Sequence, residues 1–442
     1  MSALANQRRR AIAQANAVQI VALMALLSVI AFLITSDVIV IVLGQSTVTA
    51  AAKLALLIPL ILVVILYFGR SLRGISALPE IPILVTLALA SALWSYQMFN
   101  TIERAIPLCV TTAVAISAAS ILSLRNLIVL FAVIGAISMI GSLMAIATVP
   151  GARGIPPWEN TWNGAFNHKN GLGGGSVLAL IFTMSAAAIT TGNARRFFGL
   201  CAGLSLFLLV ASESRSAQIV ALFSLAAVGA YYVMKKFALI WAVVYFLVVF
   251  IFMSVIASLL STGIMSPLFE ALDRKPTISG RLPLWSLMGP YIMEEFWLGY
   301  GYRAFWDPDS TRVVQIARDL GLGFAPHYSH NGIIETFLHV GMLGVLVLTA
   351  ALLRVGHACY VIMQSKADRT AVAAVILVMM AFVMMNIVEG TILSRTSLSW
   401  MSFVAFGTKA CLIAQIARKP ATRFRADGEA PASPRFSPAT EA

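Results

Sequence analysis

The sequence predicts an all-α protein that crosses a membrane many times. Apolar residues make up 60% of the 442 residues and charged residues only 11%, against about 45–50% and about 25% in soluble proteins. Apolar stretches of about 20 residues, each long enough to cross the hydrocarbon of a bilayer, recur from one end of the chain to the other. This composition excludes a soluble enzyme, a disulfide-rich secreted domain and a disordered binding protein.

We predict about twelve transmembrane helices, one for each apolar stretch. The first follows Arg8, Arg9 and Arg10 and is longer than the apolar region of a signal peptide, so we keep it as an anchor. The predicted spans are residues 17–35, 51–68, 81–97, 104–122, 126–148, 171–190, 196–211, 216–234, 237–260, 332–354, 369–388 and 396–416.

The spans divide the chain into five parts. Residues 1–16 form an N-terminal segment, 17–260 hold spans one to nine, and 261–331 form one large extracytoplasmic loop between spans nine and ten. Residues 332–416 hold spans ten to twelve, and 417–442 form a tail that is rich in Pro, Ala and charge and is predicted to be disordered. The large loop is the part of the chain in which chemistry outside the membrane is expected.

The distribution of Lys and Arg predicts the orientation. The loops assigned to the cytoplasm hold 19 of the 31 Lys and Arg residues, and each of these loops carries at least one. Both termini are therefore expected in the cytoplasm. The net charge of +13 is interpreted as this topology signal and not as a sign of nucleic-acid binding.

Charged residues occur where spans meet the outer boundary. Arg215 lies in the short loop between spans seven and eight, and a guanidinium there needs an anionic partner such as a ligand phosphate or the Glu389 carboxylate. The alternative is an arginine that extends to the lipid headgroups. Glu389 and Arg395 flank the loop between the last two spans, and an ion pair that closes this loop is an alternative role for them.

The large loop holds further cations and an amphipathic segment. Arg281 begins a stretch, residues 281–297, in which aromatic and aliphatic residues alternate with a few charges. This pattern fits helices that lie on the membrane interface, with Trp285 and Trp297 as anchors. Arg303 follows a pair of glycines, but no strand, turn and helix unit surrounds them, so they do not form a dinucleotide fingerprint.

Two histidines precede span ten. His327 and His330 lie at its outer mouth, with Asn331 next and Glu335 one helical turn further. A neutral histidine accepts a proton from a hydroxyl group near neutral pH. A zinc site at the two histidines is an alternative, but a third ligand is not evident, so no metal is expected. Asn331 is expected to cap the helix while His330 faces substrate.

A polar stretch precedes span six. Residues 166–170 include His168 and Lys169 and lie beside a helix N-terminus, where an anion is favoured. The glycines that follow, in residues 171–175, predict a surface on which helices pack closely.

The succession of these motifs resembles the O-antigen ligase and polysaccharide polymerase superfamily over about residues 160–400. The stretch of residues 166–172 and the late Glu389 are most similar to its exopolysaccharide branch, the succinoglycan type. The motifs that carry the resemblance are Ser214-Arg215-Ser216-Ala217, Gly280-Arg281 with Trp285, Gly299-Tyr300-Gly301 leading to Phe305-Trp306, and Ser329-His330-Asn331-Gly332 with Glu335.

The resemblance implies glycosyl transfer on the periplasmic side of a bacterial inner membrane. The donor would be an oligosaccharide on undecaprenyl pyrophosphate, and neither a cofactor nor a metal is expected. Arg215 and Arg281 match family arginines that hold the pyrophosphate, His330 matches the histidine that engages the acceptor hydroxyl, and Arg303 is a further candidate for the pyrophosphate site. The predicted supporting residues are His327, Asn331, Glu335, Glu389, His168 and Lys169.

Three activities fit this sequence. The first is polymerisation of lipid-linked repeat units into exopolysaccharide, with membrane lipid, a chain-length regulator and export proteins as partners. The second is ligation of the chain to lipid A core, since donor motifs do not determine the acceptor. The third is transport of a lipid-linked sugar, although transporters tend to place charged residues near the bilayer midplane, whereas the polar groups here gather on one side.

Overall fold

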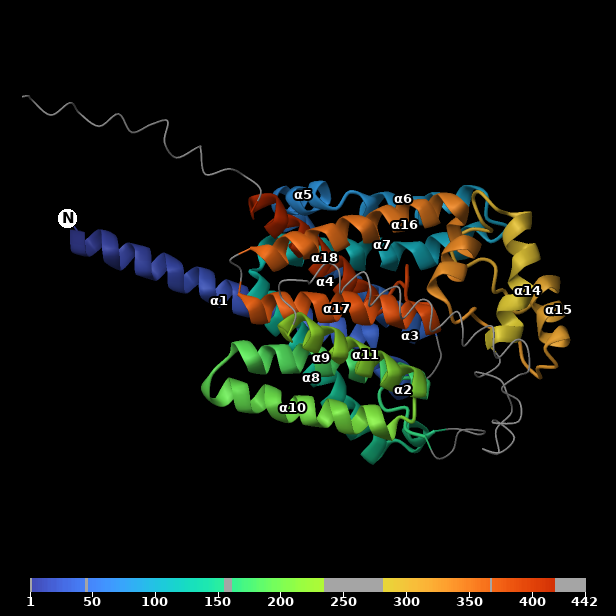
Figure 1. Ribbon diagram of the computed structural model, residues 1–442, viewed down its shortest axis with the longest axis horizontal. Helices are drawn as coiled ribbons and strands as arrows, with labels where there is room; N and C mark the ends of the chain where they lie inside the picture. Colours follow the sequence, from blue (N-terminus) through green and yellow to red (C-terminus); the bar gives the residue numbers. More distant parts are fainter. Residues whose placement is uncertain (1, 44–46, 155–160, 234–280, 366–367, 418–442) are drawn as a thin grey trace, which may run out of the picture.

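The computed structural model describes residues 2–43, 47–154, 161–233, 281–365 and 368–417. This part of the chain is built from helices and loops, without a strand, as predicted (Figure 1). Within it, eight helices are long and apolar enough to cross a membrane, or nine when one bent pair is counted as a span. The chain is thus a multi-pass membrane protein. The count of twelve stays a prediction, and the predicted span 237–260 lies outside the described residues.

The described helices cover eleven of the predicted spans at least in part. In chain order they are α1 (Ser2–Thr35), α2 (Val38–Leu43), α3 (Thr47–Ala55), α4 (Leu57–Leu66), α5 (Phe68–Ala77), α6 (Glu80–Ala90), the 3₁₀ turn η1 (Ser91–Leu93), α7 (Met98–Ile121), α8 (Leu124–Thr148), the 3₁₀ turn η2 (Pro150–Arg153), α9 (Lys169–Ile189), α10 (Gly192–Ala211), α11 (Arg215–Val233), α14 (Arg281–Glu294), α15 (Thr311–Asp319), α16 (Gly332–Gln364), α17 (Arg369–Val388) and α18 (Leu398–Ala417).

Two predicted spans differ from straight helices. Span 51–68 is the first arm of a bent pair, because the helical segments 51–66 and 68–77 meet at 85°. Span 81–97 is shorter than predicted, since the helix ends with η1 at Leu93. Apolar composition alone does not show where a helix bends or stops inside an apolar stretch.

Helix α16 is broken near its N-terminal end. Gly341 has φ +64°, a left-handed conformation that glycine adopts readily. A Cβ atom there would lie 2.3 Å from the carbonyl carbon of Trp297. The Met342 amide donates to the Phe296 carbonyl at 2.8 Å, and the Tyr300 amide donates to the Leu338 carbonyl at 2.9 Å. The segment after α14 therefore satisfies backbone groups that the break in α16 leaves free.

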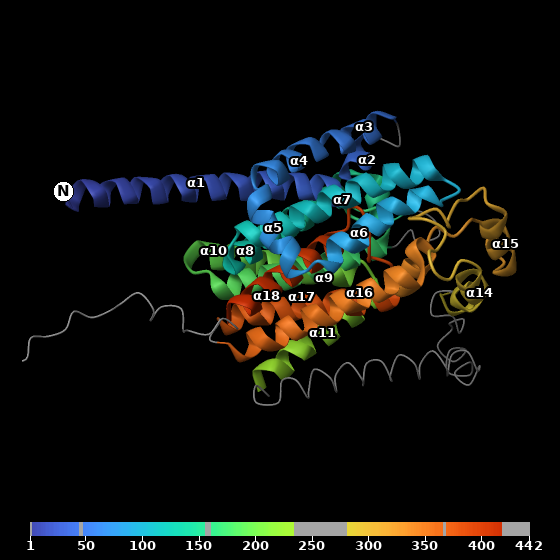
Figure 2. The ribbon, with the colours of Figure 1, turned by 90° about the horizontal axis from the view of Figure 1, so that it is seen from above.

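The helices form an elongated bundle whose two ends carry different elements. Helix α9 packs between α8 and α10, and α18 packs against α7 and α16. Figures 1 and 2 both place α14 and α15 at one end of the bundle and the start of α1 at the other, where α18 also ends. The short helices of the large loop thus gather opposite the described ends of the chain.

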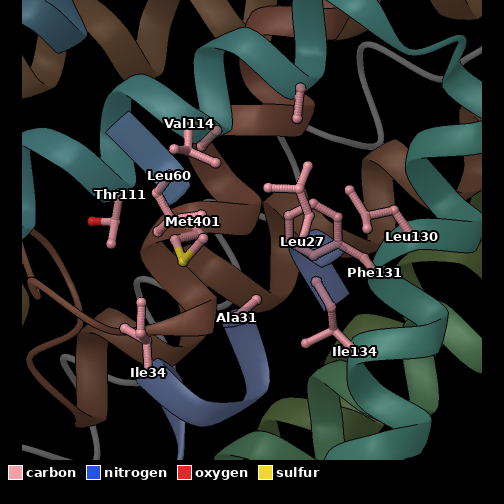
Figure 3. A pocket seen from close by; sticks show the side chains of 12 residues that line it. Leu27, Ala31, Ile34, Leu60, Thr111, Val114, Leu130, Phe131, Ile134 and Met401 are labelled. Carbon is pink, nitrogen blue, oxygen red and sulfur yellow. The ribbon is translucent and has the colours of Figure 1, made fainter. Parts of the chain in front are cut away.

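The interior of the bundle is mainly apolar. The rings of Phe131, Phe182 and Phe406 pack together, with centroid distances of 5.0 to 5.5 Å. Figure 3 shows a crevice of about 20 Å³ lined by side chains of α1, α4, α7, α8 and α18. Apart from Thr111, these side chains are apolar, and the Thr111 hydroxyl already donates to the Arg395 carbonyl at 2.9 Å. This crevice is packing space and not a reactive site.

Candidate functional site

One carboxylate, that of Glu389, joins three distant segments of the chain. Glu389 is the first residue after α17, and its side chain is 17% exposed. Its Oε1 accepts hydrogen bonds from Arg281 Nη2 at 2.7 Å and from Asn170 Nδ2 at 3.0 Å. Its Oε2 lies 3.2 Å from His330 Nδ1. Hydrogen bonds to a charged group are stronger than neutral ones, so the carboxylate fixes the three side chains relative to one another.

His330 lies in the loop before α16 with φ +56°, a conformation that is unfavourable for any residue with a side chain. Two hydrogen bonds hold the residue before it. Trp285 Nε1 donates to the Ser329 carbonyl at 2.7 Å, and the Ser329 amide donates to Glu335. The His330 ring also packs on the Tyr328 ring, with 4.0 Å between centroids. Backbone strain maintained by its surroundings is typical of functional sites.

The contact with Glu389 determines which nitrogen of His330 is free. A carboxylate accepts hydrogen bonds, so Nδ1 carries the hydrogen and the lone pair lies on Nε2. The side chain is 29% exposed, so the ring is accessible. One nitrogen oriented by a carboxylate and the other open to a reactant is the arrangement of a general base.

Glu335 stabilises the loop that carries His330 through hydrogen bonds. It is buried in the first turn of α16 and accepts a hydrogen bond from Trp306 Nε1 at 2.9 Å as well as the Ser329 amide bond. Its other oxygen lies 3.1 Å from His339 Nε2, one turn further along the helix. Glu335 thus acts as a positioning residue. Its contacts connect the Trp306 segment, the His330 loop and α16.

Asn331 is the N-cap of α16, as predicted. Its Oδ1 accepts hydrogen bonds from the amides of Ile333 at 3.0 Å and Ile334 at 3.2 Å. This leaves His330, one residue earlier, outside the helix and directed at Glu389.

The start of α9 lies beside the same carboxylate. His168 is the N-cap, and its Nδ1 accepts the Asn170 amide at 3.2 Å. Burial lowers the pKa of His168 although the nearby Glu389 opposes the shift, so the ring favours the neutral form that can accept this bond. Asn170 Oδ1 in turn accepts the Ser214 hydroxyl at 3.1 Å. Lys169 follows on α9 and is half-buried.

Asn170 and Ser214 were not among the predicted site residues. Both lie inside the motifs that carry the family resemblance. This position is the feature of the sequence that could have identified them as site residues. Their roles depend on a chain of side-chain contacts from Ser214 through Asn170 to Glu389, and this chain exists only in the folded bundle.

The structure places Arg281 and Arg215 differently. Arg281 begins α14, is 5% exposed, and pairs with Glu389. Its Nε is buried and has no hydrogen-bond partner among the described residues. Arg215 begins α11, and its side chain is exposed. The alternative that Glu389 pairs with Arg215 is therefore wrong, because α11 starts so that Ser214, and not Arg215, contacts Asn170.

Arg303 belongs to another group of cations. Arg104 Nη1 donates to the Arg303 carbonyl at 2.6 Å. Burial, followed by the nearby Arg303 guanidinium, lowers the pKa of Arg395. The alternative ion pair of Glu389 with Arg395 is wrong, because the Glu389 carboxylate pairs with Arg281 and lies beside His330. The Arg395 end of the loop is hydrogen-bonded instead to α7 and to Tyr302.

His327 and the glycines of α9 complete the predicted features. His327 is exposed, and within the described residues no group of three or more His, Cys, Asp or Glu side chains is arranged to hold a metal ion. The glycines do form a close-packing surface. A Cβ atom at Gly173 would lie 2.5 Å from Ser214, and one at Gly175 would lie 2.8 Å from the Phe166 ring.

A cavity of about 370 Å³ with a mixed polar and apolar lining adjoins the Glu389 group. One side is formed by the start of α9, with His168 and Asn170, and another by the loop between α17 and α18, from Glu389 to Ser397. Tyr328 also lines it, and burial, then the Glu389 charge, raises the pKa of this phenol, so it keeps its proton. The lining mixes apolar side chains with hydroxyl, amide and charged groups, and the hydroxyls and amides can bind the hydroxyls of sugars.

Residues 200–349 match a protein family model described as O-Antigen ligase. Over these residues the chain is similar to the O-antigen ligase and polysaccharide polymerase superfamily. The matched family indicates membrane glycosyltransferase activity of the ligase or polymerase type and substrates that are lipid-linked glycans. The matched region of this O-antigen ligase-like protein includes Arg215, Arg281 and His330, whereas Asn170 and Glu389 lie outside it. No curated protein sequence matches the chain.

Proposed function

We propose that this protein polymerises oligosaccharide repeat units, carried on undecaprenyl pyrophosphate, into exopolysaccharide. The observation that carries the proposal is the Glu389 carboxylate, which joins a candidate base, His330, and a candidate phosphate ligand, Arg281, beside a hydroxyl-lined cavity. The polymerase reading is favoured over ligation because the two features most similar to the exopolysaccharide branch, the stretch with Asn170 and the late Glu389, contact each other at this site.

His330 acts as the general base in this proposal. The acceptor is a neutral sugar hydroxyl, which is a poor nucleophile. His330 Nε2 takes its proton as the oxygen attacks the anomeric carbon, and the Glu389 carboxylate stabilises the imidazolium that forms. His168, Asn331, Glu335 and Glu389 support this arrangement by positioning the loop and the ring.

Arg281 and Arg215 stabilise the leaving group. Negative charge grows on the pyrophosphate as the glycosidic bond breaks, and the planar guanidinium matches phosphate oxygens. Arg281 Nη2 donates to Glu389, and its buried Nε has no hydrogen-bond partner among the described residues. Contacts of about 1.5–3 kcal/mol from each of two arginines would give about two to four decades in rate. Arg215 is exposed at the start of α11, one residue after Ser214, and is the second candidate contact for the pyrophosphate. Lys169 and His327 remain candidates for a supporting role at the edge of the site.

A back-side attack would invert the anomeric centre. The hypothesis rests on one candidate base, His330, placed by Glu389, with no second free carboxylate assigned as a nucleophile. Product that retains the anomeric configuration of the donor would contradict it.

The site is proposed to face the periplasm. The cavity and α14 belong to the end of the bundle that lies opposite the start of α1 and the end of α18 (Figures 1 and 2). With the cations of the short loops in the cytoplasm, this arrangement favours an inner-membrane protein with both termini inside.

The test is a transfer assay with the purified chain in lipid. A synthetic undecaprenyl pyrophosphate oligosaccharide is supplied alone and then with lipid A core, and products are identified by mass. Longer lipid-linked chains from the donor alone are expected. Transfer that requires lipid A core would replace the polymerase by a ligase, and unchanged donor in both tubes would favour a transporter. His330→Ala is the inactive control, and Arg318→Gln, an exposed position on α15, is the matched control for an unrelated surface change.

A further inference from the structure

Three arginines from separate segments gather beside the cavity. Arg104 lies near the start of α7, Arg303 follows the paired glycines, and Arg395 lies in the loop between α17 and α18. Arg104 Nη1 donates to the Arg303 carbonyl at 2.6 Å, and the Thr111 hydroxyl on α7 donates to the Arg395 carbonyl at 2.9 Å. Arg104 and Thr111 are two turns apart on one face of α7, so this helix holds both other segments.

The loop that carries Arg395 is further fixed by Tyr302. Its hydroxyl is fully buried and donates to the Leu393 carbonyl at 2.6 Å. Tyr302 directly precedes Arg303. The same two residues therefore anchor the loop and carry the Arg303 guanidinium of the cluster. Arg303 has φ +56°, a left-handed backbone conformation that an arginine adopts only when its surroundings impose it. The arrangement is therefore built by several contacts and is not a chance approach of surface side chains.

The charge of this cluster is not balanced. None of the three guanidinium groups forms an ion pair with a carboxylate in the part of the chain that the structure describes. The charges of Arg303 and Arg104 both oppose the charged form of Arg395, and the nearby Glu103, beside Arg104, favours it. Partly buried like charges are unfavourable without a counter-ion, and a guanidinium fork is suited to an anion with two oxygens.

Arg303 of the cluster and Glu389 of the candidate site line the same cavity. Arg303 lines it, as do Ser394 and Thr396 on either side of Arg395. Glu389 lines the same cavity from the other end of the loop. A ligand that reaches from His330 to Arg395 would pass along a wall of hydroxyl groups.

We propose that Arg104, Arg303 and Arg395 form a second anion-binding site, which holds a negatively charged group of the acceptor glycan. This inference rests on the proposed function, in which the donor pyrophosphate occupies Arg281 and the acceptor hydroxyl lies at His330. The acceptor then extends along the cavity toward the cluster. The shared chemistry is a pair of anionic oxygens, supplied by the pyrophosphate of a lipid-linked acceptor or by the carboxylate of an acidic sugar.

Binding measurements on the full chain in lipid nanodiscs test the site without requiring turnover. The probes are undecaprenyl pyrophosphate, a soluble glucuronate-containing oligosaccharide, and the same oligosaccharide with glucose in place of glucuronate. The variants are Arg303→Gln and Arg395→Gln, each also combined with Arg281→Gln so that lipid pyrophosphate bound at the donor site does not mask the result. Arg312→Gln is the matched control, because Arg312 pairs with Glu294 and lies over the Tyr300 ring.

We expect each cluster variant to weaken one charged probe about tenfold, equivalent to about 1.4 kcal/mol, with no change for the glucose probe. Weaker glucuronate binding would identify an acidic sugar as the source of the anion. Weaker undecaprenyl pyrophosphate binding in the Arg281→Gln background would identify the acceptor lipid. Affinities for both charged probes that equal those of Arg312→Gln would overturn the site.

Two controls keep the result interpretable. Arg303→Lys and Arg395→Lys keep the charge and should restore part of the affinity, which a purely structural role would not predict. If the cluster variants lose anion binding but the wild-type protein transfers no sugar, the proposed function fails while the anion site stands.

Discussion

Replacement of Glu389 by glutamine tests the central contact of the site. The change keeps the size of the side chain and removes its charge, so the imidazolium of His330 loses its stabilising carboxylate. Two unit charges about 3 Å apart attract by about 5 kcal/mol at an effective dielectric constant of about 20. Partial exposure of the carboxylate and its sharing with Arg281 reduce this value. We take the strength of one charge-assisted hydrogen bond, about 1.5–3 kcal/mol, and expect turnover to fall about 10- to 150-fold.

The same substitution should also lower stability. Arg281 is 5% exposed, so it would remain as a buried cation without its partner, which typically destabilises by about 3–5 kcal/mol. Activity must therefore be measured below the unfolding temperature of the variant, as single-turnover donor consumption in nanodiscs at saturating donor. Glu389→Asp keeps the charge but shortens the side chain and should retain intermediate activity.

Glu294→Gln is the matched control, because Glu294 also pairs with an arginine, Arg312, but is half exposed and lies on α14. Folded Glu389→Gln protein with wild-type turnover would refute the role of the carboxylate in catalysis. An equal loss in Glu294→Gln would show that the effect is not specific to the site.

The remaining predictions concern a helix break, a cap and a leaving-group contact. Gly341→Ala should lower the thermal unfolding temperature sharply, since its Cβ atom would lie 2.3 Å from the Trp297 backbone at φ +64°; an unchanged temperature would contradict the docking of this segment. The pKa of His168 is lowered from 6.5 in the fold, so the stability it contributes is present above pH 6.5 and is lost as the pH falls below that value. His168→Asn, which keeps a cap acceptor without titrating, should reduce this pH dependence in unfolding scans, and an identical pH profile would assign it to other groups. Arg215→Lys keeps the charge but loses the planar fork, so polymer yield should fall although membrane insertion is preserved; wild-type yield would count against the pyrophosphate role.

The positions of most helices follow from sequence, but their shapes do not. Apolar stretches predicted helices that the described structure contains, from Val18–Thr35 to Leu398–Ala417. The 85° bend after Leu66 and the break at Gly341 were not predicted. Hydropathy measures the preference of a segment for lipid, whereas a bend depends on which backbone groups a neighbouring segment can satisfy.

Sequence also selected much of the candidate site, but not its pairings. The sequence indicated the histidine loop, the Asn331 cap and the late Glu389 as site candidates. Polar residues at the ends of apolar spans are costly to place near lipid and are therefore often functional. Glu389 nevertheless pairs with Arg281 and not with Arg215 or Arg395. All three are arginines in segments on the same predicted side, so residue type and topology do not distinguish them.

The sequence by itself determined that this chain is a helical membrane protein that resembles the ligase and polymerase superfamily, because composition, span spacing and short motifs are properties of the linear chain. Only the tertiary structure decided that Asn170, Arg281 and His330 share one carboxylate and that Arg303 joins a separate group of cations. These contacts connect residues more than 50 positions apart. Their geometry is set by how the helices pack, and side-chain pairing follows from that packing.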